Sequence, residues 1–381
     1  MKPIMFIALL ISTFFFSCDK KEEKKETINF KLIKEDSLKL HFPEDRPIQA
    51  GEVFRLKNGF FLYLVKSAPN DILVFNDKGR FLKTFGGLGN EPEKFPFFPT
   101  TIVEADSGMM VFTGALMHLI KTDASQNIIE KIMVTDSLGN YIFREYRIAN
   151  HAYTGFWDSS HQIALLPIEN NVDDPYTDEF YKTKTIGIID KNGIMTKSFG
   201  EFESIYPTIK YLPQNHRPSL AYDDKNKEIY ITHSGSSEIQ VYNLQGKKLK
   251  TIDHQGNSIT DHTLRGIHKG EESGLWTKYW NEQFSYNHLF FDNSRNRLYR
   301  IYSEDTDKES ATRMEHIYEK KAYFETFHDG KFLGEILLPS NLAWRIIAID
   351  SKGTIYFKTK YTWQNEDSLE IYIYKYNLEE E

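Results

Sequence analysis

The sequence predicts an all-β fold made of six repeated, four-stranded units. The chain of 381 residues contains 22 Tyr and 28 Phe, which favour strands over helices. Short apolar runs also alternate with turns from about residue 50 to the end of the chain. The turns that recur at the same place in the pattern lie at Gly79, Gln126, Gly193, Gly246 and Gly330.

The stretch 71–112 shows this repeat most clearly. An apolar strand is followed by the turn 76–79, because Asn and Asp bond their own backbone and Gly accepts a positive φ. A second strand leads into the glycine-rich segment 86–89, and three prolines between 92 and 99 exclude a helix there. The turn 106–108 precedes the next strand. The stretch is therefore interpreted as the outer half of one unit joined to the inner half of the next.

Six segments fit one template of strand, hairpin, strand, turn and outer strand. They cover residues 59–85, 109–134, 162–199, 228–252, 297–337 and 353–376. The last segment lacks an outer strand, whereas residues 27–40 carry apolar residues with a period of two at Ile28, Phe30 and Leu32. We therefore expect a six-bladed β-propeller of four-stranded blades, closed by an N-terminal strand. The alternative is that 27–40 forms part of a tether or a short helix.

The residues around the first outer turn carry a family resemblance. Asn76 and Gly79 form the turn, and Phe85-Gly86, Gly89, the aromatic Phe95 and Pro99 follow in order. This order resembles the repeat of NHL-type six-bladed β-propellers. It is also similar to the TolB-like propeller lipoproteins of Bacteroidota, many of which are domains of unknown function. The resemblance implies the propeller fold and leaves the function open.

The N-terminus is expected to be a targeting segment. Lys2 precedes an apolar core from Ile4 to Phe16, which is too short to span a bilayer comfortably. Cys18 follows this core directly and is the one cysteine of the chain. The arrangement resembles a bacterial lipobox, which implies cleavage before Cys18 and acylation of its thiol. The alternative is an ordinary signal peptide in which a cysteine falls there by chance.

These features divide the chain into three parts. We expect a lipoprotein signal peptide at 1–17, a charged tether at 18–26 and the propeller domain at 27–381. The tether, DKKEEKKE after the cysteine, resembles the signal that sends lipoproteins of Bacteroidota to the cell surface, although a plain spacer is the alternative. The expected location is the cell envelope, as an outer-membrane lipoprotein on the periplasmic side or the cell surface.

The sequence is poor in catalytic signatures. It contains no P-loop, no Gly-x-Ser-x-Gly elbow and no His-Glu-x-x-His, and its net charge of −7 gives no basic footprint for nucleic acid. His254, His262 and His268 share one long loop, but exposed histidines are a simpler interpretation than a metal site. The strands taken as innermost are apolar, which argues against a metal-lined channel. We expect no cofactor.

The loops between blades carry the most informative residues, because in a propeller they gather on one face. Most of these candidates are basic or aromatic, which suits a glycan, a peptide or a partner protein. The candidates are Arg46, Phe97, Phe98, Arg147, His151, Trp157, His216, Arg217, Arg265, Trp280, Trp344 and Arg345. The preferred function is a non-enzymatic binding or scaffold lipoprotein, and the alternative is a metal-dependent, lactonase-like hydrolase or lyase. A simpler interpretation is that the aromatics fill blade joints and each Arg pairs with a local acid.

Overall fold

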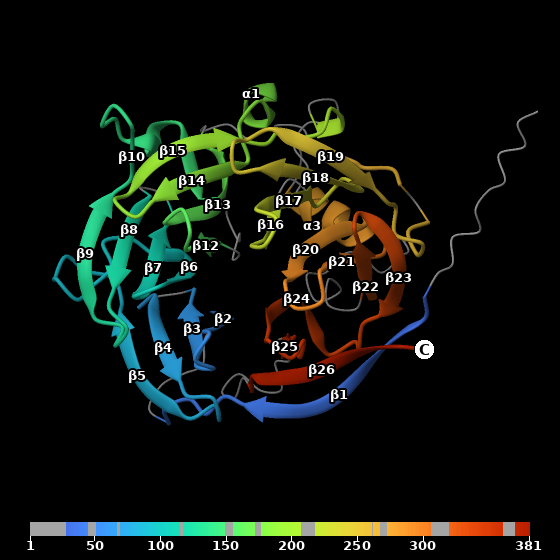
Figure 1. Cartoon of the computed structure of the whole chain (residues 1–381), viewed down its shortest axis with the longest axis horizontal. Helices are drawn as coiled ribbons and strands as arrows, with labels where there is room; N and C mark the ends of the chain where they lie inside the picture. The colour runs from blue at the N-terminus through green and yellow to red at the C-terminus, as the bar shows by residue number, and fades with distance from the viewer. Residues whose placement is uncertain are drawn as a thin grey trace, which may run out of the picture.

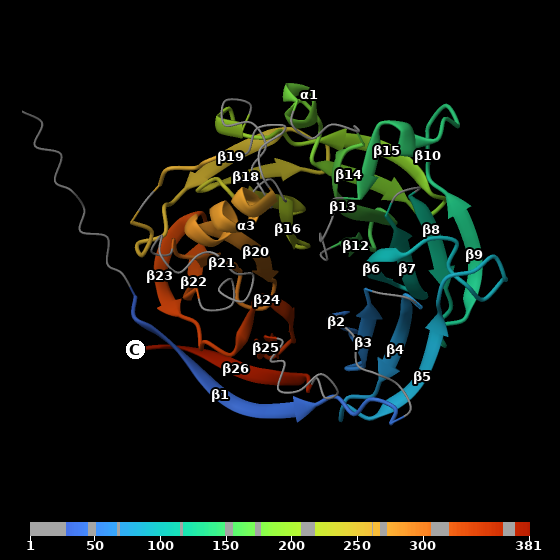
Figure 2. The ribbon, with the colours of Figure 1, turned by 180° about the vertical axis from the view of Figure 1, so that it is seen from behind.

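Six antiparallel sheets stand around a central axis and form a closed ring in the computed structural model (Figure 1). The structure describes residues 28–44, 51–66, 69–114, 117–148, 155–171, 177–206, 218–260, 262–266, 273–305, 320–360 and 370–381. Seen from the other face, the same ring has the innermost strand of each blade near the centre and the outer strand at the rim (Figure 2). The prediction of a six-bladed β-propeller is therefore confirmed.

Each blade is a meander of neighbouring strands. Blade 1 contains β2 (Gly51–Arg55), β3 (Phe61–Val65), β4 (Asp71–Phe75) and β5 (Phe81–Gly86). Blade 2 contains β6 (Pro99–Ala105), β7 (Gly108–Thr113), β8 (His118–Thr122) and β9 (Ile128–Met133). Blade 4 contains β16 (Pro218–Asp223), β17 (Glu228–His233), β18 (Glu238–Asn243) and β19 (Lys248–Asp253). Blade 5 contains β20 (Ser285–Asp292), β21 (Arg297–Ser303), β22 (Ala322–His328) and β23 (Lys331–Leu337).

Blade 3 departs from this pattern at both of its edges. Its three long strands are β13 (Ile163–Asn170), β14 (Ile186–Asp190) and β15 (Ile194–Phe199). Two short strands, β11 (Tyr146–Ile148) and β12 (Phe156–Asp158), share the inner edge of β13, and β10 (Thr135–Asp136) pairs with the outer strand in parallel. The described helices are short: η1 (Ile142–Arg144), α1 (Asp178–Tyr181) and α3 (Ser273–Glu282).

Many of the turns form because one Asx side chain organises them. At the first outer turn the Asn76 Oδ1 atom accepts hydrogen bonds from the backbone N–H groups of Lys78 and Arg80, at 3.0 and 2.9 Å. The inner hairpins of blades 3 to 6 use an aspartate in the same way, and its Oδ1 accepts from the N–H group two residues later at 2.9 Å. These aspartates are Asp158, Asp223, Asp292 and Asp350. Local chemistry therefore fixes the repeat.

The N-terminal strand closes the ring. Blade 6 consists of β24 (Leu342–Ile349), β25 (Ile355–Thr359), β26 (Tyr372–Glu380) and, as its outer strand, β1 (Phe30–Lys39). β1 runs antiparallel to β26 from the pair Phe30 and Glu380 to the pair Lys39 and Tyr372. The prediction that residues 27–40 supply the missing strand is confirmed over Phe30–Lys39, and the tether or helix alternative for them is wrong.

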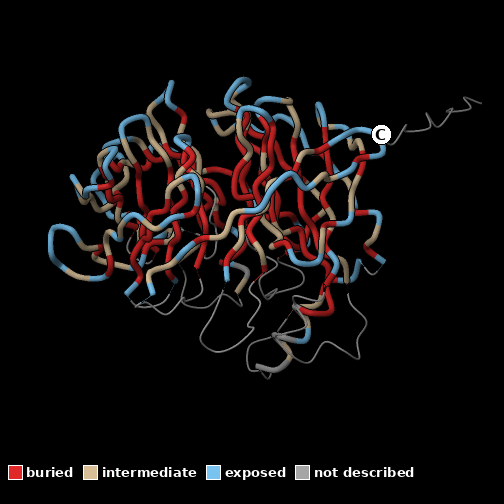
Figure 3. The backbone as a smooth tube through the Cα atoms, turned by 90° about the horizontal axis from the view of Figure 1, so that it is seen from below, coloured by how far each residue is buried: buried red, intermediate tan, exposed pale blue. Residues whose placement is uncertain are grey.

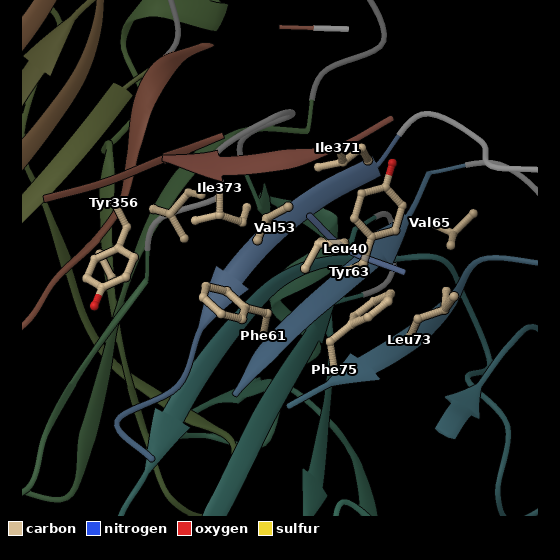
Figure 4. Close-up of a cluster of buried hydrophobic side chains, with 12 residues drawn as sticks. Leu40, Val53, Phe61, Tyr63, Val65, Leu73, Phe75, Tyr356, Ile371 and Ile373 are labelled. Carbon is tan, nitrogen blue, oxygen red and sulfur yellow. The ribbon is translucent and has the colours of Figure 1, made fainter. Parts of the chain in front are cut away.

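Blade joints are filled by apolar side chains from both neighbours. Between blades 1 and 6, Phe61 and Tyr63 of β3 pack with Tyr356 of β25 and Ile373 of β26 (Figure 4). Leu40, directly after β1, joins the same cluster. Seen from the side, buried residues occupy the inside of the blades, whereas exposed residues lie along the edges of the ring (Figure 3). Burial across the joints therefore holds neighbouring blades together.

One sequence interpretation needs correction. The apolar strands taken as innermost, such as Phe61–Val65, are the second strands of their blades, and a further strand lies inside each of them. These true innermost strands carry ionisable residues, including Glu52 on β2, His288 on β20 and Arg345 on β24. They were missed because the polar residues interrupt their apolar pattern. The innermost strands are therefore not uniformly apolar, and their composition gives no evidence against a metal-lined channel.

Gly79 of blade 1 lies directly against the end of the closing strand. Its φ is +73°, and an added Cβ would lie 2.2 Å from the Lys39 carbonyl oxygen. Gly139 also has a positive φ, +83°, but nothing lies within 4 Å of its added Cβ. We expect Gly139→Ala to lower the free energy of unfolding by roughly 1–2 kcal/mol through backbone strain. Gly79→Ala is expected to cost about 1–3 kcal/mol more through the clash. Urea unfolding of both variants measures this, and equal losses would contradict the close contact.

Candidate functional site

The two faces of the ring are defined by the direction of its strands. In a four-stranded meander, the start of the first strand, the hairpin between the second and third strands, and the end of the fourth strand lie at one end. We call this end the connection face, because the links between blades lie there. The hairpins between the first and second strands lie at the opposite face. Residues near the start of β2, β20 and β24 and near the end of β3 and β25 therefore belong to the connection face.

Several predicted site residues lie on the connection face but not in one group. Phe97 stacks on His118 with ring centroids 5.4 Å apart. Phe98 is 43% exposed and lies beside Gly114. Arg265 is held by Glu282 at 3.2 Å, so this guanidinium does pair with a local acid. Trp344 and Arg345 belong to β24 in blade 6.

Trp157 lies away from this face. It belongs to β12, immediately before the Asp158 turn at the opposite face, and its side chain lies beside Asp106 in the turn between β6 and β7. The expectation that it contributes to the connection face is therefore wrong. Trp157 precedes the hairpin that joins β12 to β13, not a link between blades. The sequence interpretation did not distinguish these two kinds of loop in blade 3.

Some predicted residues cannot be placed. Arg46, His151, His216 and Arg217 lie outside the described residues. Arg147 belongs to β11 and Trp280 to α3, but their side chains are outside the described part of the structure. Predictions for these six residues remain predictions.

A cluster of charged side chains lies where blades 1 and 6 meet on the connection face. Glu52 on β2 is 7% exposed and stands at its centre. Lys66 directly follows β3, Arg345 belongs to β24, and Lys358 lies near the end of β25. We call these four residues the Glu52 cluster. Only Arg345 among them was a sequence candidate.

The three cations of the Glu52 cluster converge on its one carboxylate. Lys66 Nζ lies 2.8 Å from Glu52 Oε1, while Arg345 Nη1 and Lys358 Nζ lie 3.0 and 3.2 Å from Oε2. Lys358 Nζ also donates to the Gly51 carbonyl oxygen at 2.9 Å. The Arg345 guanidinium additionally lies over the Phe54 ring, 5.0 Å from its centroid. The cations are thus fixed by the protein in one geometry.

The cluster is rich in cations. Among its four side chains, three cations surround the single carboxylate of Glu52. Burial alone would raise the pKa of Glu52, but the charges of Lys358, Lys66 and Arg345 hold it well below its usual value of 4.5. Burial lowers the pKa of Lys66, against the opposing effect of Glu52. The side chains of Arg345 and Lys358 are only 13% and 7% exposed, whereas that of Lys66 is 34% exposed.

Two further side chains extend this region. Lys360 lies over the Trp344 ring, with Nζ 5.0 Å from its centroid, and burial lowers the pKa of Lys360 to about 8. His288 on β20 is 4% exposed, and the charges of both Arg345 and Glu52 act on it. Blade 5 therefore contributes a polar group beside the cluster. The sequence did give one signal for these residues: each is ionisable within or beside an otherwise apolar run.

The histidines considered for a metal site have structural contacts. His254 stacks on Phe332 with ring centroids 3.7 Å apart, and its Nε2 atom lies 3.4 Å from Glu325 Oε1. Its backbone carbonyl accepts a hydrogen bond from the buried Arg300. His262 contacts Phe284 edge-on, and His268 lies outside the described residues. Among the described residues, no group of three or more His, Cys, Asp and Glu side chains is arranged to hold a metal ion.

The fold and the site together define a six-bladed propeller with three cations and one carboxylate clustered at one blade joint. A family model described as a domain of unknown function, DUF4221, matches residues 92–337, more than half of the chain. The protein belongs to the DUF4221 family. No curated protein matches the chain.

Solved structures agree on the fold. A DUF4221 family member from Bacteroides vulgatus is 15% identical with a TM-score of 0.70, and the match covers 94% of this chain and 100% of that one. A Bacteroides fragilis protein named for predicted export is 10% identical with a TM-score of 0.54, covering 92% and 95% of the two chains. A gluconolactonase from Xanthomonas campestris is 9% identical over 91% and 99% of the chains, but its TM-score of 0.47 carries no functional argument. These likenesses establish the fold alone.

The described helices are short, and none of them is long and apolar enough to cross a membrane.

Glu52 should make stability depend on pH in a defined way. We expect Glu52→Gln to lower the free energy of unfolding at pH 7 by about 3 kcal/mol, because it leaves three clustered cations without their carboxylate. The folded-state pKa of Glu52 lies below its usual 4.5, so its contribution is complete above that pH and declines as pH falls below it. The deficit of the variant should therefore be smaller at pH 3.5 than at pH 7.

Urea unfolding at both pH values measures this difference. Asp77→Asn is the matched control, because Asp77 is exposed in an outer turn of the same blade. A deficit for Glu52→Gln that is equal at the two pH values, or no larger than that of Asp77→Asn, would contradict the described electrostatics.

Proposed function

We propose that the protein is a non-enzymatic binding lipoprotein of the cell envelope and that the Glu52 cluster holds an acidic group of its ligand or partner. One observation carries the proposal: three fixed cations share one carboxylate, and two of the cations are almost fully buried. Like charges at this separation repel one another, and burial strengthens the repulsion. A bound anion would relieve it. The glycan, peptide or protein that supplies the acidic group is the partner to be identified.

Preorganisation favours binding at this place. Arg345 is held by Glu52 and by the Phe54 ring, and Lys358 is held by Glu52 and the Gly51 carbonyl. Ordering these side chains on binding therefore costs little entropy. Lys66 is the most exposed of the three and gives an incoming acid its first contact. Arg345 is suited to a planar carboxylate or sulfate because its guanidinium offers several donors in a fixed plane.

The same electrostatics disfavour the lactonase-like alternative at this site. A catalytic metal of that kind needs several carboxylate, Asn or His ligands. The Glu52 cluster offers one carboxylate that already contacts three cations, and an approaching metal cation would be repelled by those cations. We therefore favour binding over metal-dependent hydrolysis.

The membrane anchor remains part of the proposal. Cys18 at the end of a short apolar segment supports lipidation, and the similar Bacteroides fragilis protein is itself named for predicted export. Stable anchoring takes more than one acyl chain, as bacterial lipoproteins carry. The tether then leads into β1, the strand that closes the ring.

Anion binding is tested with inorganic sulfate and the detergent-solubilised full chain. We expect sulfate to raise the unfolding temperature of the wild type at low ionic strength, because a ligand that binds only the folded state stabilises it. Lys66→Ala should weaken sulfate binding by about tenfold, equivalent to roughly 1.4 kcal/mol. Lys331→Ala is the control, because Lys331 is an exposed lysine on the outer strand of blade 5. No stabilisation by sulfate, or equal binding by both variants, would refute the proposed site.

Anchoring is tested separately. Cys18→Ser removes the thiol that would be acylated. We expect the wild type in the membrane fraction of its host and the Cys18→Ser protein outside it, with mass spectrometry of the mature wild type showing acyl chains on residue 18. A wild-type protein cleaved elsewhere, or equal membrane association of the variant, would show that the segment is an ordinary signal peptide.

A further inference from the structure

The start of the closing strand fixes the point at which the tether joins the ring. β1 is the outer strand of blade 6, so its start lies toward the face opposite the connection face. Just before it, the Ile28 backbone N–H donates to the Leu333 carbonyl oxygen of β23 at 2.8 Å. Asn29 accepts a hydrogen bond from the N–H group of Glu381 at 2.9 Å. The start of β1 thus lies beside the C-terminus at the rim of the ring, between blades 5 and 6 (Figure 1).

This attachment is closely packed. Gly334 on β23 lies so near to Ile28 that an added Cβ would lie 2.4 Å from the Ile28 carbonyl oxygen. Phe30, the first residue of β1, belongs to the same apolar cluster as Leu378 of β26 and Phe324 of β22. The fold of blades 5 and 6 therefore determines where the chain leaves the ring.

The chain between the proposed anchor and this point is short. About ten residues separate Cys18 from Ile28, and they span at most about 35 Å when fully extended. The innermost strand β20 has 8 residues, so the ring measures about 27 Å from one face to the other. The tether is therefore only slightly longer than the ring is high.

A tether of this length restricts how the ring lies on a bilayer. With the opposite face toward the bilayer, the attachment point is on the membrane side and the tether has many allowed conformations. With the connection face toward the bilayer, the tether would have to run along the outside of the ring close to full extension. Restricting a chain to its extended states costs conformational entropy. The position of the attachment point therefore favours the first orientation.

We infer that the opposite face of the ring is turned toward the anchoring bilayer and that the connection face is presented to the aqueous phase. This inference rests on the proposed lipid anchor and names the surface that meets the membrane. It also restricts the partners of the connection face. The links between blades, and the Glu52 cluster with them, meet molecules from the aqueous phase and not the lipid headgroups of the anchoring membrane.

Energy transfer from a fluorescent label on the protein to acceptor-labelled lipid headgroups tests the orientation, with the acylated full chain in vesicles. Cys18 is the one cysteine of the chain and its acylated thiol does not react, so a single new cysteine takes the label. Lys352→Cys places the label in the hairpin between β24 and β25 on the opposite face. Lys278→Cys places it on α3, in the link between blades 4 and 5 on the connection face. Both positions are exposed lysines, so the two variants lose the same charge. Thermal unfolding verifies that each labelled variant is folded.

We expect the label at position 352 to lie about 25 Å closer to the bilayer than the label at 278, and therefore to transfer energy more efficiently. Inserting about twenty Gly and Ser residues after Glu26 should reduce this difference, because the tether then reaches about 100 Å.

Equal transfer from the two labels, or greater transfer from Lys278→Cys, would overturn the inference and leave the anchor in place. A difference that is unchanged with the longer tether would show that tether length does not set the orientation, and would also contradict it. Absence of the protein from vesicles after flotation would overturn the anchor itself, which separates failure of the proposed function from failure of the orientation.

Discussion

The pairing of β1 with β26 is the contact on which the rest of the structure depends. It joins the first described strand to the last, and so fixes blade 6 against blade 1. The Glu52 cluster lies across that same joint, because Glu52 and Lys66 belong to blade 1 while Arg345 and Lys358 belong to blade 6. Glu52 and Lys358 are 306 residues apart in the chain. The candidate site therefore exists only in a closed ring.

Electrostatics explain why this joint differs from a purely structural one. The buried Arg300 between blades 4 and 5 pairs with Glu325 at 2.5 Å and donates to the carbonyl oxygens of Ser237 and His254, so its charge and its donors are matched. The Glu52 cluster instead gathers three cations around one acid. A single buried pair holds two blades together, whereas cations gathered at an inner strand are the arrangement that we propose binds an acidic group.

The sequence predicts the blades well because their turns are local. An Asx residue and a glycine three residues later, such as Asn76 and Gly79, encode a turn without reference to the rest of the chain. The closing strand was also predictable, since a ring with a missing strand needs one from the other terminus. The innermost strands were misassigned because Glu52 and Arg345 interrupt their apolar pattern. Of the residues in this region, the sequence analysis identified only Trp344 and Arg345 as candidates. No local pattern predicts that residues from strands so distant in sequence lie together.

The central claim is that the three cations of the Glu52 cluster bind an acidic group. A crystal structure of the protein grown with selenate tests it most directly, because anomalous scattering of selenium locates the anion without ambiguity. The account predicts selenate within hydrogen-bond distance of Lys66 and Arg345, and its loss from crystals of Lys66→Ala. Selenate bound at other places with the Glu52 cluster empty, or selenate that stays at the cluster in Lys66→Ala, would contradict the account.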